Sequence, residues 1–168
     1  MDALYYLFTL LLIGVGLLQS ALLPYMRIAG VLPDLMLALV VAWSLLRRAP
    51  EGLIWALVGG LVLDLLSGAP FGVFTLGLVS ASLIASASAT VLFRSYALLP
   101  VVAIVPATLV YHGVVLLLLY AAGRQIDWLA TLSSVTLPAL PVNLGLMLLV
   151  FPLARWLHRQ TAQGEVRW

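Results

Sequence analysis

The side chains best suited to chemistry in this chain are two carboxylates, Asp34 and Asp64, that stand within apolar sequence. Asp64 lies in the segment 59–72, where an apolar helix is predicted to end in a glycine and proline turn. An ionisable group buried in such a segment is by default a functional hypothesis, as a site for a proton, a cation or a partner. The alternative is that its carboxylate accepts hydrogen bonds from backbone N–H groups of the turn 67–72 or of the next helix start. We favour this structural or interface role.

Asp34 follows Pro33 at the predicted start of a helix. An aspartate at this position accepts hydrogen bonds from free backbone N–H groups and complements the helix dipole, so we expect a helix cap. Catalysis by paired carboxylates would require Asp34 and Asp64 to converge. A helical hairpin permits that arrangement, but the sequence does not show that the two side chains meet.

Other polar residues within apolar segments have structural explanations. His112 could relay protons or bind metal, but no second ligand stands at metal-binding spacing, and we expect a hydrogen-bonded interior histidine. Asn143 lies among prolines, so we expect it to satisfy backbone groups that the prolines leave free, with a place in a ligand cavity as the alternative. An intramembrane hydrolase or transferase would need its acid, base and nucleophile from Asp34, Asp64, Ser67, His112 and Asn143. No nucleophile motif supports that reading, so we predict no catalytic residue, no cofactor and no metal.

The composition indicates that these residues lie in a membrane. Of 168 residues, 64% are hydrophobic and only 8% are charged, and the mean hydropathy is +1.19. A soluble domain of this size carries far more charge. Basic residues are scattered between apolar segments, which argues against a nucleic-acid partner. We therefore expect a single integral membrane domain over residues 1–168.

Six apolar segments predict an all-α bundle of six transmembrane helices. They cover residues 4–23, 33–46, 53–66, 71–93, 98–123 and 132–157. The second and third are short for a bilayer core of about 30 Å, so they must borrow flanking residues, thin the bilayer or pack inside the bundle. The charged stretch 47–52, with Pro50 and Gly52, separates these two helices into a hairpin.

Arginine positions predict the orientation, because cytoplasmic loops retain an excess of basic residues. With six spans and both termini in the cytoplasm, six arginines lie inside and two, Arg27 and Arg124, lie outside. The six are Arg47, Arg48, Arg94, Arg155, Arg159 and Arg167. The reverse orientation would place these six on the wrong side.

Small residues predict close helix contacts. Gly16 and Ser20 are one turn apart on the first helix, and this spacing suits a close contact with another membrane protein, either a coupling subunit or a single partner helix. A ridge of Ala81, Ala85 and Ala89 runs beside Ser82, Ser86 and Thr90 on the fourth helix. Packing within the bundle is the expected use of this second ridge.

Together, several of these motifs resemble the rod shape-determining protein MreD family over nearly the whole chain. The segment 33–77 is the most specific part of the resemblance. The matching residues are Pro33-Asp34-Leu35, the hairpin 47–51, Gly60 with Asp64, the Ser67-Gly68 turn leading to Phe71-Gly72-Val73, and Pro138, Asn143 and Pro152 followed by arginines.

The resemblance implies a non-enzymatic scaffold in the bacterial inner membrane that acts in cell elongation. Its expected partners are the bitopic protein MreC, and with it RodA, a class B penicillin-binding transpeptidase and the MreB filament, which together direct peptidoglycan synthesis. In our hypothesis, the cytoplasmic arginines contact either anionic lipid or MreB. The family's fold is thought similar to the substrate-binding subunits of energy-coupling-factor transporters, so a vitamin-binding subunit is the alternative. Short outer loops with few polar groups weigh against that alternative. The residues expected to define the fold or an interface are Asp34, Gly60, Asp64, Ser67, Gly68, Gly72, Asn143, Gly16 and Ser20.

Overall fold

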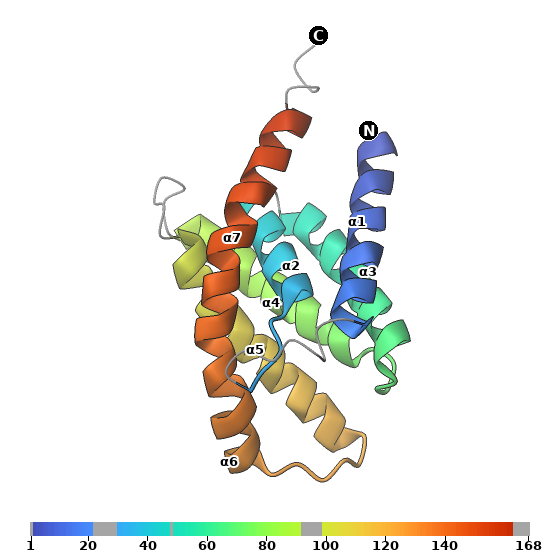
Figure 1. The fold of residues 1–168 in the computed structure, drawn as a ribbon, viewed down its shortest axis with the longest axis vertical. Coiled ribbons are helices and arrows are strands. Elements are labelled where there is room, and N and C mark those ends of the chain that lie inside the picture. Colours follow the sequence, from blue (N-terminus) through green and yellow to red (C-terminus); the bar gives the residue numbers. More distant parts are fainter. Residues whose placement is uncertain (1, 22–29, 48, 92–98, 163–168) are drawn as a thin grey trace.

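The chain folds as a bundle of helices in which the last three helical elements form one continuous rod (Figure 1). This computed structural model describes residues 2–21, 30–47, 49–91 and 99–162. The elements are α1 (Asp2–Ala21), α2 (Leu35–Leu46), α3 (Ala49–Ser67), α4 (Val73–Val91), α5 (Leu99–Ala121), α6 (Trp128–Thr131), the π-helix η2 (Leu132–Thr136) and α7 (Leu137–Ala162). Six helical rods therefore occupy the six predicted segments of the described chain.

The short helix α2 forms the centre of the bundle. Nine of its twelve residues are buried, and it contacts α1, α3, α4, α5 and α7. Around α2, the other helices pack in sequence: α1 against α3, α3 against α4, α4 against α5, and α5 against α7. Of the three ways a short helix can fit a membrane, packing inside the bundle is the one that α2 adopts.

The third helix begins earlier than predicted, at Ala49 and not at residue 53, so it includes Pro50 and Gly52. Proline is tolerated in the first turn of a helix, because its missing N–H would have no intrahelical partner there. Arg47 and Glu51 form an ion pair of 3.6 Å across the α2–α3 junction. Four of the six residues that were predicted to separate the helices, 49–52, thus belong to the first turn of α3.

The prolines of the last two rods do not end their helices. Pro106 lies inside α5, and Pro141 and Pro152 lie inside α7. The sixth rod starts at Trp128, before the predicted residue 132, and reaches Gln160 as one apolar helix. The predicted ends at residues 23 and 93, and the arginines at positions 27, 48, 94 and 167, lie outside the described residues.

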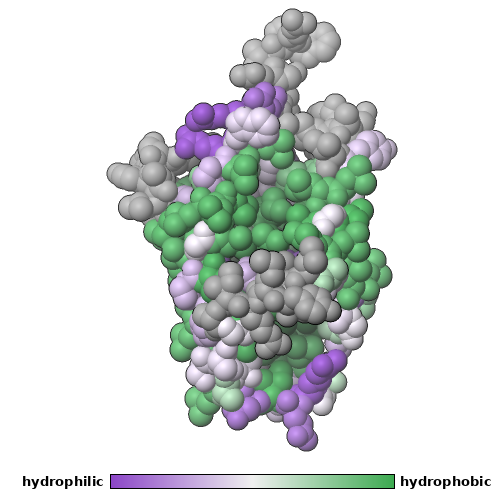
Figure 2. Space-filling model, viewed as in Figure 1, coloured by the Kyte–Doolittle hydropathy of each residue, from purple (hydrophilic) through white to green (hydrophobic). Residues whose placement is uncertain are grey.

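The surface has the distribution expected of a multi-pass membrane protein. On the face drawn in Figure 2, hydrophobic residues cover the middle of the bundle and hydrophilic residues gather at its two ends. Three described rods are long and apolar enough to cross a bilayer, Ala49–Ser67, Leu99–Ala121 and Trp128–Gln160. Three further apolar helices are shorter, Phe8–Ala21, Leu35–Leu46 and Val73–Ala89. Large apolar side chains such as Leu10, Leu65 and Leu149 are 66% to 75% exposed on the bundle exterior.

Candidate functional site

Asp64 joins the end of α3 to the start of α4. Its carboxylate is 4% exposed and accepts hydrogen bonds from the backbone N–H groups of Gly72, Phe74 and Thr75 at 3.0, 2.9 and 3.1 Å. The Thr75 hydroxyl donates a fourth bond at 2.5 Å. Because the first N–H groups of a helix have no partner within it, Asp64 acts as the cap of α4 from a neighbouring helix. The expected contact with the turn and the next helix start is what the structure shows.

The turn that brings α4 back to Asp64 depends on two glycines. Gly68 and Gly72 have φ values of +65° and +96°, a region that side chains with a Cβ rarely adopt. Ser67 contributes a hydroxyl that donates to the Asp64 carbonyl at 3.4 Å and accepts from Ala69 N–H at 3.2 Å. The residues Ser67, Gly68 and Gly72 thus shape the turn that places the donors around the carboxylate.

Two glycines permit close approach of α3 to its neighbours. A Cβ at Gly60 would lie 2.4 Å from the Thr75 Cα, so α3 and α4 touch backbone to backbone beside Asp64. A Cβ at Gly16 would lie 2.5 Å from Val62 Cγ1 of α3. Gly16 is therefore used in internal packing, whereas Ser20 is exposed and its hydroxyl bonds to the Leu17 carbonyl.

Asp34 is the centre of a second polar network, which connects four helices. Its Oδ1 accepts from Leu37 N–H at 3.0 Å, the expected helix cap, and from Gln19 Nε2 of α1 at 3.1 Å. Gln19 Oε1 in turn accepts from Met36 N–H at 3.0 Å. The carboxylate also interacts electrostatically with Tyr111 and His112 of α5.

Asn143 completes this network from α7. Its Oδ1 accepts from Asp34 N–H at 3.1 Å, and its Nδ2 donates to Thr108 Oγ1 of α5 at 3.4 Å. We expected Asn143 to satisfy backbone groups freed by the prolines of its own helix. The structure shows a different role, since α7 continues through its prolines and Asn143 is used to bind the start of α2.

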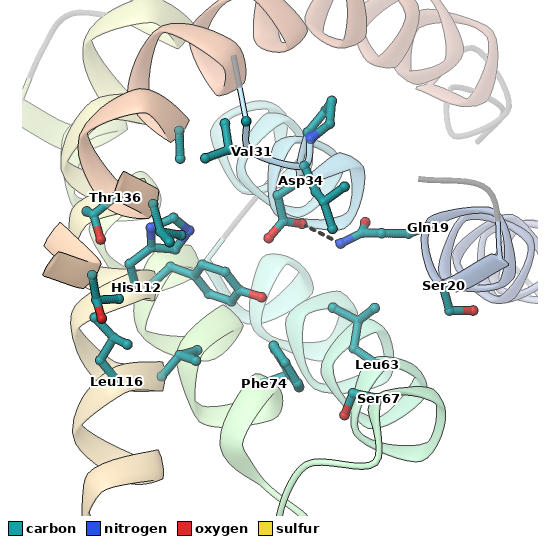
Figure 3. Close-up of a pocket in the computed structure, with 18 of the residues that line it drawn as sticks. Gln19, Ser20, Val31, Asp34, Leu63, Ser67, Phe74, His112, Leu116 and Thr136 are labelled. Carbon is teal, nitrogen blue, oxygen red and sulfur yellow. Dashed lines mark hydrogen bonds between the residues drawn. The ribbon is translucent and has the colours of Figure 1, made fainter. Parts of the chain in front are cut away.

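A cavity of about 630 Å³ opens beside Asp34, between α1, α3, α5 and the η2–α7 rod (Figure 3). Asp34, Ser67 and Ser20 line it, together with Gln19, His112 and Thr136, which the sequence analysis did not assign to a site. Figure 3 shows Asp34 and Gln19 on one side of this space and His112 and Thr136 on the other. Among the described residues, these polar groups come from α1, from the cap of α2, from α5 and from η2.

Two groups in the cavity lining lack a hydrogen-bond partner among the described residues. They are the Thr136 hydroxyl, in a residue that is 2% exposed, and Nδ1 of His112. The expected hydrogen bond of His112 is therefore not made at Nδ1. Thr136 ends the π-helix η2, and such single-turn irregularities are frequent at functional sites.

Asp64 and Asn143 are both used to join helices. Asp64 is saturated by hydrogen bonds at the α4 N-terminus, and the Asn143 amide is bonded to the backbone at the start of α2. Within the described part of the chain, no three His, Cys, Asp or Glu residues are grouped as metal ligands. What the site offers is a mostly apolar cavity with one carboxylate, an imidazole and hydroxyl groups at its rim.

Comparison with known proteins places the chain in a family. The model of the rod shape-determining protein MreD matches residues 1–160, and it describes a family of non-enzymatic shape-determining membrane proteins. No curated protein and no solved structure matches the chain. Because the family model covers nearly the full length, this chain belongs to the MreD family of rod shape-determining proteins.

Proposed function

We propose that this protein is the membrane scaffold that holds MreC in the rod complex and so helps to direct peptidoglycan synthesis. Family membership over residues 1–160 carries the proposal. The internal chemistry supports it, because Asp64 and Asn143 are used to hold helices together, and the outer helix faces remain apolar. RodA, a class B penicillin-binding transpeptidase and MreB are the further partners in this complex. Both termini lie in the cytoplasm.

A partner helix needs a face where backbones can approach closely, which small residues provide. In the predicted pair of Gly16 and Ser20, Gly16 already packs against α3. At Gly14, Gly113 and Gly145, by contrast, an added Cβ would have no atom within 4 Å. Large apolar side chains flank each of them, such as Leu10 and Leu17 beside Gly14. We propose that the single membrane helix of MreC packs on one of these three faces.

The first experiment is co-expression with MreC, affinity purification in mild detergent and mass determination of the complex. We expect a stoichiometric complex. Three matched variants, Gly14→Leu, Gly113→Leu and Gly145→Leu, each add bulk to one exposed face and leave the core unchanged. One of them should abolish MreC recovery while the other two do not.

Two results would count against the scaffold. If the wild-type protein purified without MreC under conditions that preserve its fold, the direct interaction would be ruled out. If all three variants bound MreC like the wild type, an interface at these glycine faces would be wrong. The alternative, a vitamin-binding transporter subunit, has no support from the comparisons and rests on the cavity alone. It would gain support if the purified protein carried a vitamin.

A further inference from the structure

The cavity beside Asp34 lies at the level where lipid headgroups meet hydrocarbon. Along the continuous rod, Thr136 is 8 residues from Trp128 and 19 residues from Arg155. At 1.5 Å per residue these separations are about 12 Å and about 28 Å. Trp128 packs against Tyr120 with ring centroids 5.7 Å apart, and such aromatic residues favour the membrane interface. Since the hydrocarbon core is about 30 Å thick, the cavity lies at the edge of the leaflet opposite Arg155.

The polar lining of the cavity suits a ligand that donates hydrogen bonds. Asp34 is 8% exposed; its Oδ1 accepts from Leu37 N–H and Gln19 Nε2, and its carboxylate also interacts with the Tyr111 side chain. A carboxylate offers about four lone-pair sites, so these contacts leave capacity for one further donor. Among the described residues that line the cavity there is no arginine, and the chain contains no lysine. Within this described lining, the carboxylate of Asp34 favours a ligand that carries a positively charged donor over one that is only anionic.

Unpartnered groups on the opposite wall indicate that the site is built for an occupant. The Thr136 hydroxyl is buried without a hydrogen bond and borders the cavity, as does Nδ1 of His112 (Figure 3). Leaving such groups unpaired costs free energy, which a ligand bonded to them would recover. Between the polar walls the lining is apolar, with Leu63, Leu66, Val115 and Leu116.

We propose that this cavity binds the headgroup of phosphatidylethanolamine. The primary ammonium group donates to the Asp34 carboxylate, and the Thr136 hydroxyl donates to an oxygen of the headgroup. The first carbons of the acyl chains lie against Leu63, Leu66, Val115 and Leu116. A volume of about 630 Å³ holds the headgroup and these first carbons, and it is typical of small-molecule sites.

The test is native mass spectrometry of the full-length protein in detergent, with added lipids of identical acyl chains. Phosphatidylcholine has the same phosphate but a methylated ammonium that cannot donate a hydrogen bond, and phosphatidylglycerol has no ammonium. We expect phosphatidylethanolamine to be retained about tenfold over both, the contribution of one charge-assisted hydrogen bond. Equal retention of the three lipids would overturn the proposal.

Asp34→Asn should abolish the preference while preserving the fold, because asparagine is also a good helix cap and keeps Oδ1 for Leu37 N–H. Asp127→Asn is the matched control, since Asp127 is exposed and caps α6 through Ala130 N–H at 3.0 Å. It should retain the wild-type preference. If Asp34→Asn remained folded by its melting temperature and still preferred phosphatidylethanolamine, the assignment of the ammonium to Asp34 would be wrong.

Thr136→Val tests the opposite wall and does not depend on Asp34. Valine has nearly the same shape, and the hydroxyl that it replaces has no partner in the folded protein. We expect total retention of phosphatidylethanolamine to fall about fivefold, with its preference over phosphatidylcholine unchanged. Glycerophosphoethanolamine, the soluble headgroup, should not displace the lipid at equal concentration. Displacement by it, or a bound vitamin in place of lipid, would show that the occupant is not a lipid.

Discussion

Two buried aspartates in this protein have the same chemistry but different surroundings. Asp64 receives three backbone N–H groups and one hydroxyl, which satisfies its carboxylate within the fold. Asp34 receives one backbone N–H group and the Gln19 amide, and it borders a cavity. Since an unsatisfied carboxylate in a membrane is costly, Asp64 is structural, whereas Asp34 is both a helix cap and the residue to which we assign the ligand's ammonium group.

Replacing Asp64 should destabilise the protein strongly. In Asp64→Asn one of the two carboxylate oxygens becomes an N–H₂ group, which faces backbone donors instead of accepting from them. We expect the free energy of unfolding to fall by about 3 kcal/mol, in the range of hydrogen bonds to charged groups. Equilibrium unfolding in mixed micelles, followed by tryptophan fluorescence, measures this loss.

Asp127→Asn is the control for that measurement, because Asp127 caps α6 at an exposed position through a single backbone bond. Asparagine caps helices about as well as aspartate, so the expected loss is below about 0.5 kcal/mol. Similar losses for the two variants would mean that the Asp64 contacts do not stabilise the fold.

At the residue scale, the sequence predicts capping better than it predicts networks. The caps at Asp34 and Asp64 follow from neighbouring residues, because their donors are 3 to 11 positions away. The bond from Asp34 to Asn143 spans 109 positions and the contact of Asn143 with Thr108 spans 35. A single sequence does not fix which helix faces meet, so Gln19, Thr108 and Thr136 could not be assigned to the site from it.

Helices α3 and α4 are held together by a contact that only glycine permits. The Cβ that alanine would add at position 60 meets the Thr75 backbone at 2.4 Å, and backbone atoms cannot move aside as a flexible side chain can. The same contact brings Thr75 to Asp64. The close approach and the polar cap therefore depend on each other.

Gly60→Ala should separate α3 from α4 and lower the free energy of unfolding by about 2 kcal/mol, as overpacked cores do. Gly145→Ala in α7 is the matched control, since nothing lies within 4 Å of its added Cβ. There alanine should stabilise the helix by up to about 1 kcal/mol through its higher helix propensity. Unfolding of both variants in mixed micelles checks the opposite signs. A Gly60→Ala protein as stable as the wild type would show that α3 and α4 can separate without loss.

Asn143 joins α7 to the start of α2, so its loss should loosen the central helix. Asn143→Ala leaves Asp34 N–H buried without its acceptor, and we expect a loss of about 2 kcal/mol. Thr108→Val removes only the longer bond of 3.4 Å and should reduce stability by less than about 1 kcal/mol. Hydrogen exchange of the α2 amides provides a second reading, with faster exchange in Asn143→Ala alone. Equal effects of the two variants would contradict the role of the Asp34 bond.

At the element scale, the sequence predicts the six helices correctly, but the predicted first residues of the third and sixth helices are wrong. Hydrophobic runs identify each rod, because a chain in lipid must satisfy its backbone groups within helices. The predicted start of α3 is wrong because the prediction places Pro50 outside the helix. Proline breaks a helix when it lies in the interior, but it fits the first turn, where Pro50 lies. The prolines of α5 and α7 are likewise accommodated without a break.

At the scale of the whole bundle, the face drawn in Figure 2 has hydrophilic residues at both ends and hydrophobic residues between them. Arg155 and Arg159 lie near one end of the last rod, and Arg124 follows α5 at the other end. The predicted six-to-two distribution of arginines places the first end in the cytoplasm. The absence of cysteine from the sequence makes this orientation directly testable with single-cysteine variants.

Gln125→Cys and Gln160→Cys place one thiol at each end without altering any charge, and both positions are exposed. In intact cells a membrane-impermeant maleimide should label position 125, because that loop is predicted to lie outside. Position 160 should react only after the membrane is permeabilised. Labelling of both variants in permeabilised cells controls for the reactivity of each thiol. The reverse pattern would place the termini outside, and the arginine count would then not determine how this protein inserts.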